Sequence, residues 1–189
     1  MSTPFRVKRL FWLSLALALA LYAVMVLWSL PRIQAAAGGA LPFDLRPTGY
    51  GFDDAAAFLG QISPEGRGFY LHVQHWLDTF YPPLLAITLA SGIRWMAPQG
   101  WGRWTIALML LPVPGLLFDW LENARVATLL RASDVSAAMV AAASEATLLK
   151  SAFTTVAILA FCVVLALRLW KRWRLAWNGT AAPARTGDP

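Results

Sequence analysis

Long apolar runs dominate the pattern of hydrophobic and polar positions along this chain. The first run covers residues 10–30 without a charged side chain. At about 1.5 Å per residue, a helix of this length crosses a hydrocarbon core of about 30 Å. Three further runs, each interrupted by a few polar residues, cover about residues 71–95, 104–123 and 148–169. The pattern predicts an all-α integral membrane protein with four transmembrane helices.

The composition supports a membrane protein and removes some chemistry from consideration. Hydrophobic residues make up 58% of the chain and charged residues only 14%, which is too apolar for an ordinary soluble surface. The single cysteine, Cys162, lies inside the fourth apolar run. One thiol forms neither an internal disulfide nor a paired-thiol redox motif, so a thiol oxidoreductase is excluded.

The first run also allows a second interpretation. Its basic prelude and the small residues that follow at 35–37 resemble a signal peptide with a cleavage site. A signal-peptide apolar region usually covers about 7 to 15 residues, which is shorter than this run. We therefore favour a retained spanning helix.

The distribution of charge predicts the orientation of the helices. The net charge is +6, and most of the 16 basic residues lie beside apolar runs rather than in one patch, which argues against nucleic acid as a partner. With the N-terminus inside, the cytoplasmic segments hold Arg6, Lys8, Arg9, Arg94, Arg103, Arg168, Lys171, Arg172, Arg174 and Arg185. The positive-inside rule then predicts an up-down-up-down bundle with both termini in the cytoplasm. We interpret the membrane as a bacterial inner (plasma) membrane, with the lipid bilayer as the protein's main partner.

The segment between the first two runs predicts a short helical cap on the outer face. It begins as a Gly- and Pro-rich loop at Pro31, and a short helix is expected over residues 53–59. Ser63, followed by Pro64, has the pattern of a second helix N-cap. The Ala-rich residues 133–145 form either a separate outer helix or an extension of the fourth span. We expect a single membrane domain over residues 1–176 and a disordered cytoplasmic tail over residues 177–189.

Polar residues inside the spans are the candidate functional residues. A charged side chain near the centre of a spanning helix costs about 2.5 to 3.5 kcal/mol on insertion scales, so such residues usually face protein or water. The predicted topology places them at one depth, in the outer third of the bundle, and helical spacing groups them on shared faces. The predicted polar site contains His72, His75, Asp78, Asp119, Glu122, Asn123 and Lys150.

Prolines lie beneath this polar layer in two of the predicted spans. Pro82 and Pro83 release the carbonyls of Asp78 and Thr79, while Pro112, Pro114 and Gly115 disturb the third span. Such breaks are tolerated where neighbouring groups, water or a ligand satisfy the freed backbone. The combination predicts kinked helices and a small cavity that opens towards the outer face.

The polar residues also have a purely structural interpretation. Asp119, Glu122 and Lys150 could form an ion pair that only holds helices together, and the two histidines could bond to neighbours or water. His75, Asp78, Asp119 and Glu122 have suitable chemistry for a metal ion, but H-x-x-H differs from the zinc motif H-E-x-x-H. The sequence therefore identifies no cofactor.

Two functional hypotheses remain after motif searches. The chain contains no glycine-rich phosphate loop, no G-x-S-x-G, no C-x-x-C and no EF-hand pattern. We favour a non-enzymatic accessory or assembly component that pairs with other membrane proteins, its polar ring serving helix packing. The alternative is a membrane enzyme or binding protein for a lipophilic small molecule, with an acid and histidine site near the outer face.

Overall fold

The computed structural model describes residues 3–180, with side chains described for residues 5–177. All regular structure in this part of the chain is helical. In chain order the elements are α1 (Thr3–Val24), η1 (Met25–Ser29), α2 (Leu30–Ala36), η2 (Phe43–Leu45), α3 (Phe52–Gln61), α4 (Pro64–Phe69), η3 (Tyr70–Gln74), α5 (His75–Met96), α6 (Gly102–Leu110), α7 (Pro112–Arg131) and α8 (Ala137–Thr180).

Within the described residues, three helical segments are long and apolar enough to cross a membrane. They are Phe5–Ala36, Gly102–Arg131 and Ala137–Trp177. The predicted all-α membrane class is therefore confirmed. The second predicted span, residues 71–95, is helical as η3 and α5 but is not among the three. The fourfold crossing thus remains a prediction.

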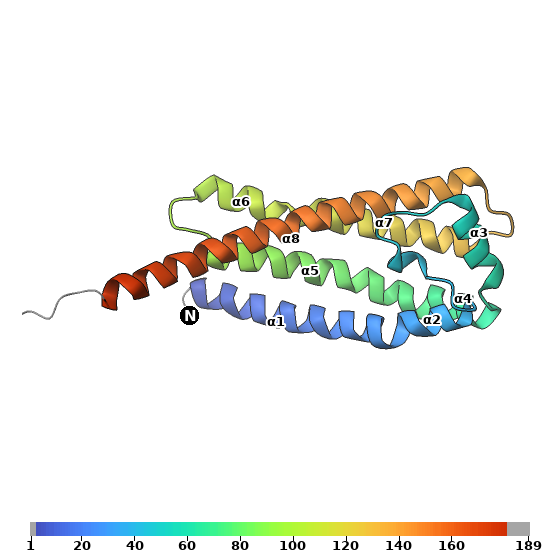
Figure 1. Ribbon diagram of the computed structural model, residues 1–189, viewed down its shortest axis with the longest axis horizontal. Coiled ribbons are helices and arrows are strands. Elements are labelled where there is room, and N and C mark those ends of the chain that lie inside the picture. The colour runs from blue at the N-terminus through green and yellow to red at the C-terminus, as the bar shows by residue number, and fades with distance from the viewer. Residues whose placement is uncertain (1–2, 181–189) are drawn as a thin grey trace, which may run out of the picture.

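The long helices lie side by side along the longest axis of the molecule (Figure 1). The connections between them alternate between the two ends, and α3 and α4 lie across one end. At the opposite end, α8 extends past the other helices. Helix α5 packs against α1, α7 and α8, and α7 packs along α8. Helix α5 is therefore the central element of the bundle.

The first helix continues beyond Pro31, so the predicted loop start at this residue is wrong. Helix α1 passes through η1, a turn of π-helix, directly into α2, which ends at Ala36. Pro31 is the second residue of α2 and directly follows η1, so its missing amide falls where the regular hydrogen-bond pattern of the helix is already interrupted. Gly38 and Gly39, with φ of 61° and 95°, then turn the chain out of the helix.

The residues between α2 and α5 form a cap with a hydrophobic core of its own. The ring of Phe43 lies 4.8 Å from that of Tyr50 and 4.9 Å from that of Phe58. Phe43 and Phe58 are fully buried, and the same core includes residues from α2, α7 and α8, among them Ile33, Leu129 and Val140. Burial chiefly raises the pKa of the Tyr50 phenol, so this ring stays neutral.

Arg67 of α4 connects the end of α3 with the end of α7. Its Nη1 donates to the carbonyl of Leu130 at 2.8 Å and its Nη2 to that of Leu59 at 2.9 Å. These carbonyls lie at the ends of α7 and α3, where backbone acceptors lack helical partners. The Oγ of Ser63 accepts from the amide of Gly66, so the predicted N-cap is confirmed, as is the short helix expected at 53–59.

The Ala-rich residues 133–145 are resolved as an extension of the fourth span rather than a separate helix. They enter α8, which runs without interruption from Ala137 to Thr180. The rings of Trp173 and Trp177 lie 5.9 Å apart on successive turns, which continues the helix into the predicted tail. Residues 181–189 of that tail lie outside the described residues.

Candidate functional site

Lys150 on α8 holds two carboxylates of α7. Its Nζ lies 3.4 Å from Oδ1 of Asp119 and forms a closer salt bridge with Oε2 of Glu122. The hydroxyl of Thr147 donates to the other oxygen of Glu122 at 2.5 Å. The Glu122 side chain is only 3% exposed, so this network ties α7 to α8 away from water.

Asp78 on α5 is buried on a neighbouring helix without a salt bridge among the described residues. The amide Nε2 of Gln74, one turn earlier, donates to its Oδ1 at 2.9 Å. Gln74 lies in η3 and is fully buried. The spacing of four residues, about one helical turn, therefore brings an amide beside the Asp78 carboxylate.

The Asn123 side chain forms its described hydrogen bonds with α5 rather than with the carboxylates or Lys150. Its Nδ2 donates to the carbonyl of His75 at 3.1 Å and lies 3.2 Å from Oγ1 of Thr79. The indole Nε1 of Trp120 donates to the carbonyl of Thr79, which Pro83 leaves without its helical donor, at 3.0 Å. A side chain of α7 thus satisfies the backbone that the proline frees, and α5 continues as one helix.

The predicted histidines lie outside the carboxylate cluster. His72 is exposed and His75 is half-buried, and neither lines the cavity described below. In the described part of the chain, no three His, Cys, Asp or Glu side chains gather in a way that could hold a metal ion. Among the described residues, the candidates His75, Asp78, Asp119 and Glu122 are not gathered as a ligand set.

A cavity of about 320 Å³ lies beside this cluster. Helices α1, α5, α7 and α8 with η1 form its sides, and the segment 44–47 closes it on the side of the cap. Its polar lining consists of Asp44, Asp78, Asp119, Lys150, Ser151, Thr154 and Thr155. Its remaining lining consists of Tyr22, Met25, Val26, Leu30, Leu45, Pro47, Tyr81, Leu85 and Ile158. The predicted residues Asp78, Asp119 and Lys150 are thus brought to one space with a polar part and apolar walls.

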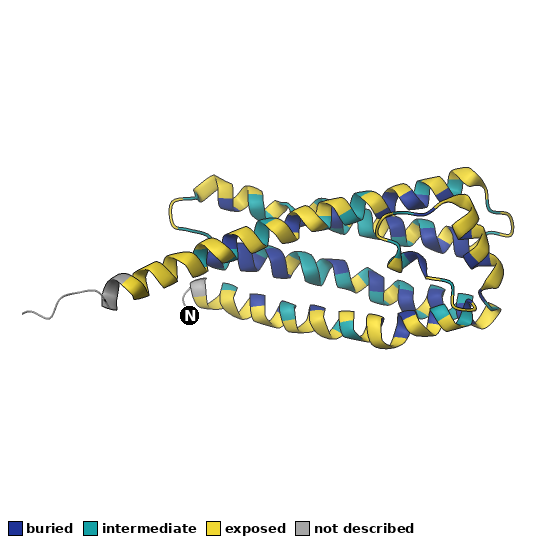
Figure 2. Cartoon of the chain, viewed as in Figure 1, coloured by how far each residue is buried: buried dark blue, intermediate teal, exposed yellow. Residues whose placement is uncertain are grey.

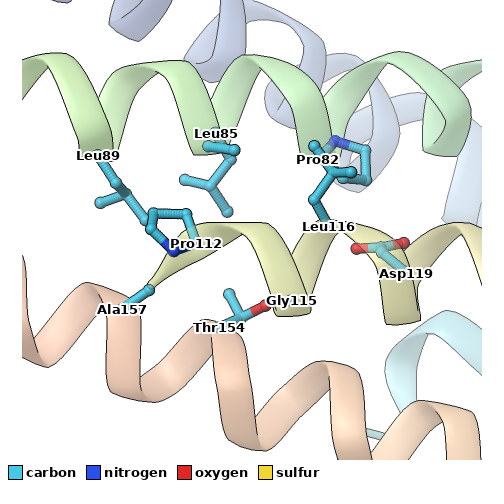
Figure 3. A pocket seen from close by; sticks show the side chains of 10 residues that line it. Pro82, Leu85, Leu89, Pro112, Gly115, Leu116, Asp119, Thr154 and Ala157 are labelled. Carbon is cyan, nitrogen blue, oxygen red and sulfur yellow. The ribbon is translucent and has the colours of Figure 1, made fainter. Parts of the chain in front are cut away.

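A narrow gap continues from Asp119 towards the middle of the bundle (Figure 3). Pro82 and Leu85 of α5 face Pro112 and Gly115 of α7 across it, with Thr154 and Ala157 of α8 alongside (Figure 3). Its volume of about 10 Å³ is close to the room that one water molecule needs. Of the prolines predicted to shape a cavity, Pro82 and Pro112 line this gap, and none lines the larger cavity.

Asp44 was missed by the sequence analysis. It lies in η2, in the segment predicted to be a loop, and its Oδ2 accepts from Oη of Tyr70 at 2.5 Å. The segment carries no periodic pattern, and only the tertiary fold brings it to the cavity. Gln74 was missed as well, although its spacing of four residues from Asp78 could have indicated the contact.

The cavity opens between α1 and α8. Its exposed lining residues include Tyr22 on α1, Val26 on η1 and Ile158 on α8, which are 49%, 37% and 40% exposed, and also Leu45 and Pro47 in the cap segment. Further from the cap, α1 and α8 approach each other through Phe11 and Phe161, whose ring centroids are 6.1 Å apart. The opening therefore has a lateral part between two of the helices that can cross a membrane, and Leu45 and Pro47 border it at the cap.

Such an arrangement suits a molecule with one polar end. Carboxylates, hydroxyls and an ammonium group can bind a polar headgroup, while the apolar walls accept a hydrocarbon chain. Comparison of the chain with protein-family models, curated proteins and solved structures gave no match. The kind of molecule that the site could bind is therefore inferred from its own residues.

Proposed function

We propose that the chain crosses a bacterial inner membrane four times, in up-down-up-down order, with both termini in the cytoplasm. Helix α5 is the additional span, and at about 1.5 Å per residue its 22 residues reach about 33 Å. Neighbouring helices cover its polar residues Asp78, Thr88 and Ser91, so these side chains need not face lipid. The orientation is supported by the basic residues that flank the apolar runs.

We further propose that the protein binds a lipophilic small molecule in the cavity between α1 and α8. The observation that carries this proposal is the lateral opening of a space of about 320 Å³ with a polar part near the cap. A molecule dissolved in the bilayer could enter it without crossing the cap. The space is at the lower end of the range of about 300 to 1,000 Å³ typical of ligand pockets.

The experiment is photolabelling in lipid nanodiscs with decanol that carries a diazirine in its chain, followed by mapping of the labelled residues. Thr155 lines the mouth on α8, whereas the next residue, Val156, is 50% exposed and does not line the cavity. We expect label on lining residues such as Met25 and Leu85. Thr155→Trp should remove it, and Val156→Trp should leave it. Label confined to outward residues such as Leu159, unaffected by Thr155→Trp, would contradict the proposal.

A second function, the accessory or assembly role, is favoured by one observation. Lys150 already pairs with both Asp119 and Glu122, so these acids can serve helix packing alone. Copurification from native membranes in a mild detergent tests this role. A stoichiometric protein partner retained by Thr155→Trp would support it, and recovery of the chain alone would argue against it.

A further inference from the structure

The charges around the cavity are unbalanced. Asp44, Asp78 and Asp119 line it together with Lys150, and Glu122 lies directly behind Lys150. Four carboxylates thus surround one ammonium group. Asp119 and Glu122 share that ammonium group, and among the described residues neither Asp44 nor Asp78 forms a salt bridge.

Three arginines at this end of the molecule bind other groups. Arg46 donates to the carbonyl of Leu41 and lies 3.6 Å from Asp54, while Arg125 donates to the carbonyl of Ala142. Arg67 binds the two helix ends described above. None of these arginines lines the cavity. The carboxylates that line the cavity therefore outnumber the protein cations that line it.

Asp78 is the carboxylate best placed to meet a ligand. The residue is only 6% exposed, it lines the cavity, and its described hydrogen bond uses Oδ1 alone. The Oε1 of its partner Gln74 is buried without a hydrogen-bond partner in the described part of the chain. A neutral amide supplies no counter-charge to this carboxylate, and a cationic group in the cavity would supply one.

Two tyrosines add a surface that favours the same charge. Tyr22 of α1 and Tyr81 of α5 both line the cavity, with ring centroids 5.7 Å apart. Aromatic faces attract cations, most strongly where water is excluded. From the surplus of carboxylates, the position of Asp78 and this tyrosine pair, we propose that the cavity selects amphiphiles with a cationic amine headgroup. The headgroup lies between Asp78 and Asp44, and the hydrocarbon chain leaves through the opening between α1 and α8. This inference rests on the proposed binding function and names its ligand class.

The test compares three decyl diazirine probes in nanodiscs that differ only in the headgroup: trimethylammonium, hydroxyl and carboxylate. We expect the ammonium probe to label the cavity at a concentration at least about tenfold lower than the hydroxyl probe. The carboxylate probe should be the weakest. Asp78→Asn and Asp44→Asn keep an acceptor for Gln74 and Tyr70, respectively. Each should reduce the ammonium preference and leave labelling by the hydroxyl probe unchanged.

Asp134→Asn is the matched control, since Asp134 is exposed and does not line the cavity. It should retain the full preference. Equal labelling of the cavity by the ammonium and hydroxyl probes would overturn the cationic class while the binding function stands. Loss of preference in Asp134→Asn to the same degree as in Asp78→Asn would also overturn it, because the effect would then be one of total charge. Failure of all three probes to label the cavity would remove the binding function and this inference together.

Discussion

The cap and the membrane part of this protein are held together in different ways. The core at the cap buries large side chains, including Phe43, Phe58 and Leu130. The long helices approach one another closely at small residues such as Gly115 and Gly92, and Phe11 and Phe161 pack against Gly92. Many large apolar side chains of these helices are exposed, and most of α1 is coloured as exposed in Figure 2. Water drives apolar side chains together only where they can leave it, and lipid offers no such gain. The two parts should therefore respond differently to the same kind of substitution.

The largest difference is expected for removal of a large apolar side chain. Phe58→Ala should lower the free energy of unfolding by about 3 to 5 kcal/mol, because Phe58 is fully buried in the cap core. Leu159→Ala on α8, at a residue that is 58% exposed, should change it by less than about 0.5 kcal/mol. Reversible unfolding in mixed micelles measures both. Equal losses would show that the two parts share one mode of stabilisation.

In the membrane part, loss of a charge should have the effect that loss of an aromatic ring has in the cap. Lys150→Met leaves Asp119 and Glu122 without their ammonium partner and should cost about 3 kcal/mol. Removing the carboxylates as well, in Lys150→Met with Asp119→Asn and Glu122→Gln, should restore most of that loss. The same unfolding assay applies. If the triple variant were no more stable than the single one, the network would not act through charge balance.

Glycine substitutions should have opposite signs in the two parts. A Cβ on Gly115 of α7 would lie 2.8 Å from Oγ1 of Thr154 and 3.2 Å from its backbone nitrogen. Gly115→Ala should therefore separate α7 from α8 and cost about 2 kcal/mol. Gly60→Ala in α3 of the cap meets no atom within 4 Å and should stabilise by about 0.5 to 1 kcal/mol. Melting temperatures in mild detergent should move in opposite directions, and a common direction would contradict this prediction.

A smaller loss than that at Gly115 is expected at the hydrogen bond that fixes the cap to α8. The Oγ of Ser144 accepts from the backbone amide of Tyr50 at 2.9 Å, and Ser144→Ala should cost about 1 kcal/mol. Hydrogen exchange at the amide of Tyr50 should become faster. Ser133→Ala, at an exposed position, should leave that exchange unchanged. Unchanged exchange in Ser144→Ala would show that packing alone orders this segment.

The sequence predicted the helical class well because long apolar runs reflect the solvent in which a helix lies. The predicted ion pair also follows from local rules, since Asp119 and Glu122 share a helix face and Lys150 lies at the same depth. The cap core could not be predicted from the sequence by such rules. Phe43 and Tyr50 lie in a segment without periodicity, and their burial depends on contacts with distant helices.

The candidate site was predicted in part for the same reason. Asp78, Asp119 and Lys150 lie on regular helices, where spacing indicates a shared face. His75 shares that spacing, but spacing alone does not give the direction of its side chain relative to the neighbouring helices. Asp44 and the π-helical turns η1 and η3 depend on tertiary contacts, which a single sequence does not display.

The composition of the cap core sets the order in which the protein can be assembled during synthesis. The core contains Ile33 from the first long helix, Phe43 and Phe58 from the segment after it, and Val140 from the last. The ribosome makes the early residues of this set long before Val140 and Ala143 exist. The cap segment must therefore leave the ribosome with its aromatic side chains uncovered, and its core can close only when the last helix has been made. During that interval the exposed aromatic surface is a target for chaperones and proteases.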